Sequence, residues 1–236
     1  VINNKINNFC IKPKLSMLAP DTGTRLQLEQ ITTEKDLGVC FTNNLKWRTH
    51  CLSSAAKANS VMGQLKHAFT AWSISSFKIL YTSFIRPHLE YASSVWNPLL
   101  KSDEKIIENV QRRATRLVKS LREYDYEKRL SILGLTTLKR RRIRGDLISF
   151  FKINNGFLET NWLASTRFMS SINCTGPAKS IRGHKKRLAP QLTRCSARSN
   201  FLTNRVATHW NNLPQDIVEA RSTNNFKALL NSTSQH

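Results

Sequence analysis

Carboxylate side chains are scarce in this sequence of 236 residues, which contains 15 Asp and Glu against 37 Lys and Arg. Two-metal phosphoryl transfer needs carboxylates that hold two ions about 3.5–4 Å apart. No two Asp residues are adjacent, and the neighbouring Asp103 and Glu104 are better explained as the first turn of a helix. The G-x-S-x-G, P-loop and G-x-G-x-x-G motifs are missing as well. We therefore expect no complete catalytic site, no metal site and no cofactor in this chain.

Cysteine pairs at metal-binding spacing are also missing. The five cysteines are odd in number, and no two of them form a C-x-x-C pair. This pattern favours reduced, structural thiols over a disulfide framework or a zinc knuckle. Isolated histidines such as His50, His88 and His209 are interpreted as core or capping groups, and the five tryptophans as core residues.

Long apolar segments are lacking too. The longest nearly apolar run, FKILYTSFI, is far too short to span a bilayer and contains a Lys. No charged segment followed by an apolar run and a cleavage site is present, so secretion is not indicated. We expect a nuclear or cytoplasmic protein with no membrane contact.

Positive charge is the feature that the sequence has in excess. The formal net charge is +22, and the isoelectric point is near 10.4. Self-repulsion of this size destabilises a compact chain, which suggests a polyanionic partner that neutralises it. Nucleic acid is the first candidate for this partner, and an anionic membrane surface is the second.

The hydrophobic pattern predicts a mainly α fold with a small β fragment at the N-terminus. Four regions are expected: a β fragment over 1–47, a helical domain over 48–153, an irregular linker over 154–200 and a helical extension over 201–236. In the β fragment, alternation in RLQLEQI places Leu26, Leu28 and Ile31 on one face.

Several helix boundaries are predicted from capping residues. Thr49 can cap a first helix, and Ser73 or Ser75 can cap a second. Pro87 would end or kink that second helix and would suit the first turn of a third, which is expected to continue through Trp96.

One longer amphipathic helix is predicted for SDEKIIENVQRRATRLVKSLR, beginning at Ser102. Val110, Ala114, Leu117 and Leu121 fall on one side of a helical wheel. The predicted nucleic-acid-binding cations of this stretch are Arg112, Arg113, Arg116 and Lys119.

A second basic stretch follows a short helix, YEKRLSIL, that is expected to end at Gly134. In TTLKRRRIRGDLISFFKI, cations crowd the first turns of a predicted helix, against the direction that the helix dipole favours. A bound anion would explain them, although a solvated face or a nuclear-localisation signal is also possible. The predicted binding residues here are Lys139, Arg140, Arg141, Arg142 and Arg144, and those of the later RGHKKRL are Lys185, Lys186 and Arg187.

A family resemblance connects these segments. EKDLGVCFTNNLKWRTHC, LYTSFIRPHLEYASSVWNP, IENVQRRATRLV, YDYEKRLSILGLTTLKRRRIRGDLISFFKINNG and FLTNRVATHWNNLP resemble the C-terminal part of reverse transcriptases of non-LTR (LINE-like) retrotransposons, in the CR1 and jockey-like group. The resembling segments run in order from about residue 34 to the tail.

The resemblance implies the end of a polymerase palm, a helical thumb and a C-terminal extension. It implies that Leu37, Gly38 and Val39 lie near the primer end, and that the thumb holds a template-primer duplex, an RNA/DNA or DNA duplex, by its backbone. The catalytic Asp residues and their Mg²⁺ belong to the palm of the complete enzyme and are expected before Val1, so the rest of the polymerase is a possible partner. The Cys/His knuckle found at the end of some members is missing.

Two other functions remain open from the residues alone. The chain could be a helical protein-interaction module whose charge serves only solubility, or a nonfunctional relic of the element.

Overall fold

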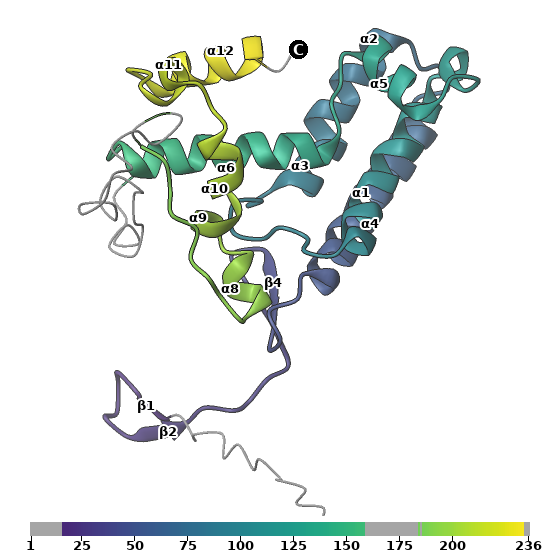
Figure 1. Ribbon diagram of the computed structural model, residues 1–236. Coiled ribbons are helices and arrows are strands. Elements are labelled where there is room, and N and C mark those ends of the chain that lie inside the picture. Colours follow the sequence, from purple (N-terminus) through teal and green to yellow (C-terminus); the bar gives the residue numbers. More distant parts are fainter. Residues whose placement is uncertain (1–15, 159–183, 185, 234–236) are drawn as a thin grey trace, which may run out of the picture.

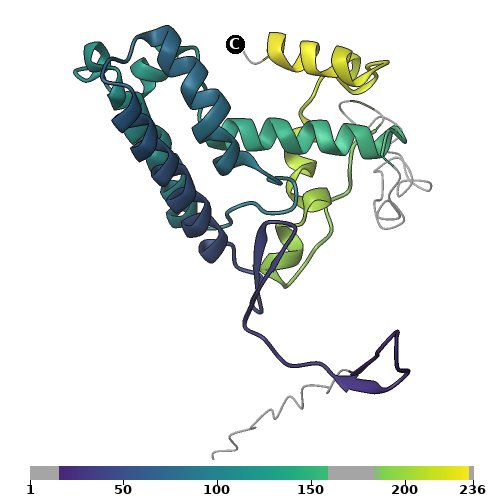
Figure 2. The same ribbon diagram turned by 180° about the vertical axis from the view of Figure 1, so that it is seen from behind.

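The chain folds mainly as helices, which confirms the predicted fold class. The computed structural model describes residues 16–158, 184 and 186–233 (Figures 1 and 2). Two small antiparallel hairpins precede the helices. The helices surround two hydrophobic cores, and α6 (Leu138–Asn154) contributes residues to both.

The first hairpin consists of β1 (Ser16–Leu18) and β2 (Arg25–Gln27). Figures 1 and 2 both show it standing apart from the helices. Leu26, Leu28 and Ile31, which alternation placed on one face, remain about half exposed. Within the described part of the chain, therefore, nothing covers the apolar side chains of this hairpin.

The second hairpin pairs β3 (Thr33–Asp36) with β4 (Val39–Thr42). Leu37 and Gly38 form its two-residue turn, with φ angles of +44° and +85°. Positive φ at both central residues is typical of the type I′ turn, whose twist matches that of paired strands. The predicted β fragment is therefore present as two separate hairpins.

The first core is built around α1 (Arg48–Ala68), which packs along α4 (Lys101–Ala114). Ala58 and Met62 of α1 are buried in this core. The prediction that Thr49 caps this helix was wrong: the N-cap residue is Trp47, and no side chain caps the helix there.

The chain then continues through α2 (Ile74–Leu80), the π-helix η1 (Tyr81–Ile85) and α3 (Arg86–Glu90). Ser73 caps α2 in a capping box, which confirms one of the two predicted caps. Pro87 lies in the first turn of α3, which continues directly from the π-helical turn η1.

The predicted helix through Trp96 was wrong, because α3 ends at Glu90. Ala92 has a φ of +52°, and the chain turns there. The fully buried indole of Trp96 donates from Nε1 to the carbonyl of Tyr91 at 2.7 Å. Burial of this side chain in the first core therefore decides the backbone path more strongly than local helix propensity does.

The long helix predicted from Ser102 is also shorter than expected. It begins one residue earlier, as α4 (Lys101–Ala114), and the chain continues in two 3₁₀ turns, η2 (Thr115–Leu117) and η3 (Lys119–Leu121). Thr115 explains the break. Its hydroxyl donates to the Arg112 carbonyl at 3.0 Å and accepts from Arg129 Nε at 3.0 Å.

The short helix α5 (Tyr126–Leu133) ends at Gly134, as predicted. Gly134 has left-handed backbone angles, and its N–H donates to the Leu130 and Ser131 carbonyls. At the other end, Asp125 caps α5 by accepting from the Lys128 N–H at 2.7 Å.

The second core joins the C-terminal half of α6 to the tail of the chain. Phe150 and Phe151 of α6 contact Trp210 and Phe226, with ring centroids 4.8 and 4.2 Å apart respectively. The tail helices are α8 (Ser196–Ser199), α9 (Leu202–Arg205), α10 (Ala207–Asn211), α11 (Gln215–Val218) and α12 (Thr223–Thr233).

Candidate nucleic-acid interface

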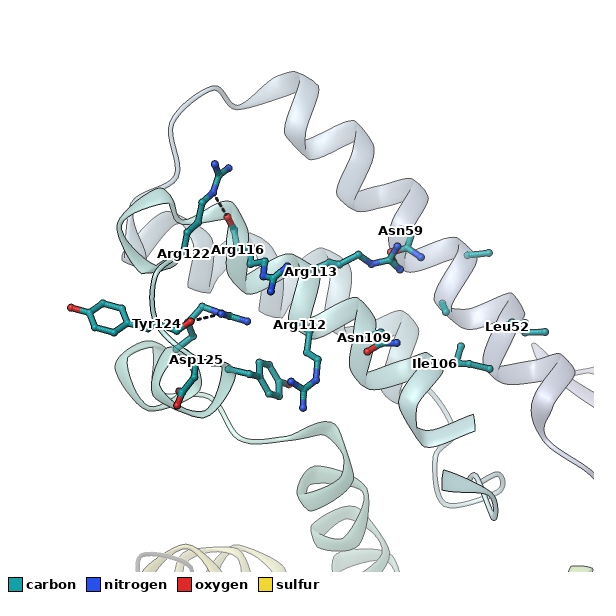
Figure 3. Close-up of a pocket in the computed structure, with 14 residues that line it drawn as sticks. Leu52, Asn59, Ile106, Asn109, Arg112, Arg113, Arg116, Arg122, Tyr124 and Asp125 are labelled. Atoms are coloured by element: carbon teal, nitrogen blue, oxygen red, sulfur yellow. Dashed lines mark hydrogen bonds between the residues drawn. The ribbon is translucent and has the colours of Figure 1, made fainter. Parts of the chain in front are cut away.

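A hollow of about 810 Å³ opens between α1, the end of α4 and the start of α5 (Figure 3). Most of its charged lining is positive, and Asp125 is the one carboxylate residue among the lining side chains of the described chain. The cations that line it are Arg112, Arg113, Arg116, Arg122 and Arg129.

An adjoining hollow of about 600 Å³ extends this basic surface along α1. It shares Arg113, Arg116 and Arg122 with the first hollow and adds Lys66. We call the two hollows together the basic cleft. Lys119 lies beside it in the sequence and is exposed, but it is not one of the residues that line either hollow.

Neutral groups hold the cleft arginines in place. Arg113 Nη2 donates to Asn59 Oδ1 at 3.0 Å, and Arg122 Nε donates to the Arg116 carbonyl at 3.0 Å. The Arg112 guanidinium lies 4.0 Å from the centre of the Tyr126 ring. None of the cleft arginines has a carboxylate within ion-pair distance among the described residues. The guanidinium groups are therefore oriented without being neutralised.

The pKa of Arg129 is sensitive to the positive charges of the cleft. Burial lowers this pKa, and the positive charges of Arg116 and Arg112 lower it further. A guanidinium stays protonated in any case at neutral pH. The positive charges of Arg112 and Arg116 thus add to the effect of burial, and a bound anion would relieve their repulsion with Arg129.

The break in α4 creates this arrangement. Because the helix stops at Ala114, η2 and η3 turn the chain so that Arg122 returns to the Arg116 carbonyl. Arg129 then reaches the same place from α5, through hydrogen bonds to Thr115 and to the Tyr124 carbonyl. The structure thus brings Arg112, Arg113 and Arg116 to one hollow, and their contact with nucleic acid stays a prediction.

Arg122, Arg129 and Lys66 were not predicted as part of this surface. They come from three different segments, and no spacing in the sequence relates them. For Arg122 and Arg129, the one signal in the sequence was the excess of cations in the segment after residue 110.

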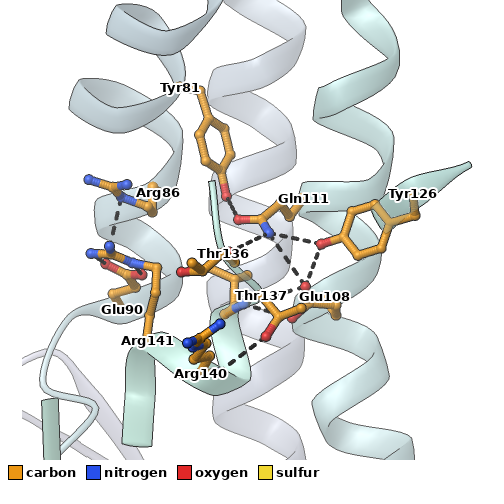
Figure 4. Close-up of polar contacts among 11 residues, drawn as sticks. Tyr81, Arg86, Glu90, Glu108, Gln111, Tyr126, Thr136, Thr137, Arg140 and Arg141 are labelled. Atoms are coloured by element: carbon orange, nitrogen blue, oxygen red, sulfur yellow. Dashed lines mark hydrogen bonds and ion pairs between the residues drawn. The ribbon is translucent and has the colours of Figure 1, made fainter. Parts of the chain in front are cut away.

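The basic run at the start of α6 is different, because carboxylates of the same chain neutralise much of it (Figure 4). Arg141 forms a two-pronged ion pair with Glu90, and Lys139 pairs with Glu104 at 3.2 Å. The hydrogen bonds that Arg141 donates to Glu90 raise the pKa of Arg141. The prediction of a free, nucleic-acid-facing Arg141 was therefore wrong.

Arg142 is buried, so its assignment to a nucleic-acid-binding face was also wrong. Only 3% of the residue is exposed, and its Nε donates to Asn97 Oδ1 at 3.1 Å. Burial lowers its pKa, while the charges of Glu104 and Glu108 oppose that shift.

The anion predicted at the start of α6 is a side chain of this protein. The Glu108 carboxylate accepts from the Leu138 N–H at 3.0 Å, at the positive end of the helix dipole (Figure 4). It also accepts from the Tyr126 hydroxyl. Helix propensity did not explain the cations, but intramolecular carboxylates do.

The other predicted cations lie elsewhere. Arg140 is exposed and Arg144 is half-buried, and both line a separate hollow of about 690 Å³ beside Leu230. Arg144 Nε donates to Asn231 Oδ1 at 3.1 Å.

The third basic stretch lies by the second core. Lys186 and Arg187 are half-buried, and the Lys186 carbonyl accepts from Trp210 Nε1 at 2.8 Å. Lys185 lies outside the described residues. The structure thus separates this stretch from the cleft cations.

The predicted primer-end residues form the tip of the second hairpin. Leu37 is 83% exposed, and its carbonyl accepts from the Tyr91 hydroxyl at 3.0 Å. A Cβ atom at Gly38 would lie 3.3 Å from the Tyr91 ring, so the close approach requires glycine. Val39 is buried in the first core. Their proximity to a primer end remains a prediction.

Other chemistry is sparse in the described chain. No group of three or more His, Cys, Asp or Glu residues among the described residues could hold a metal ion. His50 is buried against Trp96, and burial together with the charge of Lys57 lowers its pKa to about 4. None of the described helices is both long and apolar enough to span a bilayer.

No protein-family model, curated protein or solved structure matches this chain.

Proposed function

We propose that this chain is the C-terminal part of a non-LTR retrotransposon reverse transcriptase and that its helical region binds the sugar-phosphate backbone of nucleic acid. The sequence resemblance motivates the parent activity, which is RNA-directed DNA synthesis. The basic cleft supports the binding role within it.

One observation carries the binding role: several arginines share one cleft without ion-pair partners in the described chain. On an ordinary protein surface, cationic side chains are interspersed with carboxylates. Here Arg112, Arg116 and Arg122 line one hollow, with Asp125 as the one acidic residue of the lining among the described residues. Such a field attracts a polyanion, and guanidinium groups suit phosphate oxygens because they donate in pairs.

Backbone binding of this kind carries no sequence preference. Phosphate contacts position a nucleic acid without reading base edges. An A-form RNA/DNA hybrid would be held in the same way, by shape and backbone contacts. Affinity should fall steeply with salt, by about 0.9 log units per log unit of salt for each phosphate neutralised on a B-form duplex.

The isolated chain is not expected to polymerise, because the metal-binding carboxylates are attributed to the palm of the complete enzyme. A primer-extension reaction with Mg²⁺ tests this on the purified chain. Template-dependent synthesis that copurifies with the chain through two independent columns would contradict the assignment of these residues to a non-catalytic part.

Charge reversal tests the binding role directly. The variant Arg112→Glu/Arg116→Glu/Arg122→Glu should weaken duplex binding. It should also make the slope of log affinity against log salt shallower by the amount expected for about three lost phosphate contacts. Fluorescence anisotropy with a labelled RNA/DNA duplex, measured from about 50 to 200 mM salt, gives both quantities.

A matched variant separates the cleft from net charge. Arg25→Glu/Lys35→Glu/Arg221→Glu makes the same change in charge at exposed positions outside the cleft. We expect this control to keep most of the salt slope. Equal losses in the two variants would show that only overall charge matters and would contradict a binding cleft.

A second candidate function, a protein-interaction module, is favoured by one feature. The β1–β2 hairpin exposes Met17, Leu18 and Leu26 at 51–62%, and a two-stranded hairpin is marginally stable by itself. A polypeptide surface, such as the rest of the polymerase, would cover it. This function would be preferred if the cleft reversal left duplex binding unchanged at low salt.

A further inference from the structure

Two tyrosines lie at the basic cleft in contrasting states. Tyr126 is 6% exposed, its hydroxyl bonds Glu108 and Gln111, and Arg112 covers its ring. Tyr124 is 47% exposed, and its ring projects outward from the rim of the cleft (Figure 3). Only the second ring is therefore open to a ligand.

The backbone of Tyr124 is held from both sides. Its carbonyl accepts from Arg129 Nη1 at 2.6 Å, and its N–H donates to the Leu121 carbonyl at 3.2 Å. The next residue, Asp125, is fixed as the N-cap of α5. The backbone that carries the exposed ring is thus held by hydrogen bonds, which limits the conformational entropy lost when a ligand packs against the ring.

The position of the ring relates it to the cations. Tyr124 lines the same hollow as Arg112, Arg116 and Arg122. A phosphate held by these arginines would bring the base of its own or the adjacent nucleotide to the rim of the cleft. An unpaired base can stack on an aromatic ring there, whatever its identity. A base inside a duplex is already stacked on both faces and gains nothing from the contact.

We propose that Tyr124 stacks on an unpaired base and that the basic cleft therefore favours a single-stranded segment over a continuous duplex. This inference rests on the proposed backbone binding and specifies the form of nucleic acid that the cleft prefers. The tyrosine supplies the stacking surface, and the arginines supply the charge that brings the strand to it.

Anisotropy with two probes tests the inference. One probe is a labelled single-stranded RNA of mixed sequence, about 12 nucleotides long, which is within the range of about 4–16 nucleotides that one single-strand-binding OB fold covers. The other probe is a duplex of about 60 base pairs, in which frayed ends are a minor fraction. Tyr124→Ala should weaken single-strand binding by about 5- to 150-fold, the range for one lost base stack, and change duplex binding less than twofold. The salt slope should stay the same, because no charge is removed.

Two further variants keep the result interpretable. Tyr124→Phe retains the aromatic face and should bind single strands like the wild type. Tyr91→Ala removes another exposed tyrosine, which follows α3 and is not part of the cleft lining, and should leave both affinities unchanged.

The outcomes separate this inference from the proposed function. Suppose that the wild type binds both probes and that Tyr124→Ala either binds them equally well or loses the same affinity for each. This result would overturn base stacking while leaving backbone binding intact. A wild-type chain that binds neither probe at low salt would overturn the proposed binding role and the stacking with it.

Discussion

Gln111 is a single buried amide that joins three segments of the first core. It is fully buried, and its Oε1 accepts from the hydroxyl of Tyr81 in η1 (Figure 4). Its Nε2 donates to the Tyr126 hydroxyl at 2.8 Å and to the Thr136 carbonyl at 3.1 Å. Burial raises the pKa of both tyrosines, so both hydroxyls keep their protons at neutral pH. The network also fixes the ring on which Arg112 lies.

We expect Gln111→Leu to destabilise the protein by about 1–3 kcal/mol. The change leaves the fully buried Tyr81 hydroxyl without its partner, and an unpaired buried polar group costs about this much. Denaturant unfolding measures the difference. The same change at the exposed Gln215 should stay within about 0.5 kcal/mol. Similar losses at the two sites would mean that the buried network contributes little.

His50 makes stability depend on pH. It accepts from the Cys40 N–H at 3.2 Å inside the core, and its pKa is lowered from 6.5 to about 4, first by burial and then by the charge of Lys57. Between these two values the unfolded chain binds a proton that the folded chain does not. Stability is therefore fully present above pH 6.5 and falls as the pH drops toward 4.

The predicted size is about 2 kcal/mol lost between pH 7 and pH 5, from this residue alone. Unfolding free energies of the wild type and of His50→Gln at both pH values measure it, because other titrating groups cancel in the comparison. The variant should lose about 2 kcal/mol less than the wild type over this interval. Parallel pH profiles would contradict a neutral, buried imidazole.

At the scale of elements, capping residues predicted helix boundaries only where the signal was local. Ser73 and Gly134 act within one turn of backbone, and both predictions were confirmed. The ends of α3 and α4 were missed because they depend on distant partners. Trp96 must bury its indole, and Thr115 bonds Arg129 fourteen residues away. No local pattern carries that information.

The glycines at Gly134 and Gly63 should respond oppositely to alanine. Gly134 has a φ of +61°, and a Cβ atom would approach only the end of the Lys78 side chain, so Gly134→Ala should cost about 1 kcal/mol, mostly as backbone strain. Gly63 lies within α1, and a Cβ atom there would meet nothing within 4 Å. Gly63→Ala should stabilise by about 0.5–1 kcal/mol.

Thermal and denaturant melts of both variants measure these shifts. Each variant serves as the control for the other, because the chemical change is identical. Two shifts of the same sign would contradict the left-handed cap at the end of α5 or the helical state of Gly63.

At the scale of the whole molecule, the charge excess predicted a polyanionic partner but not which cations are available to it. Arg141 and Arg142 belong to a run that looked like a binding surface, yet Arg141 is paired with Glu90 and Arg142 is buried. Arg116 and Arg122 lack such partners in the described chain and line the cleft. Ion pairing with carboxylates far away in the sequence makes this division, so composition and spacing could not show it.

One internal cation, Arg205 of α9, joins the two cores. Its guanidinium forms a two-pronged pair with Asp146 of α6 at 2.7 and 2.8 Å, and both side chains are less than 10% exposed. It also donates to the Ser93 and Ser94 carbonyls, which belong to the turn after α3. Three segments that are distant in the sequence are thus held at one point.

Arg205→Met should therefore cost about 3–5 kcal/mol, because it leaves the Asp146 carboxylate buried without its partner. Adding Asp146→Leu removes that charge, and the double variant should be more stable than the single variant by at least about 2 kcal/mol. Denaturant unfolding monitored separately by tryptophan fluorescence and far-UV circular dichroism also tests the coupling. The single variant should lose its tryptophan fluorescence in two steps, because Trp96 and Trp210 lie in separate cores that would unfold at different denaturant concentrations. The prediction would be contradicted if the double variant were no more stable than the single variant and if both variants unfolded in one step. Apolar packing along α6, and not this ion pair, would then hold the cores together.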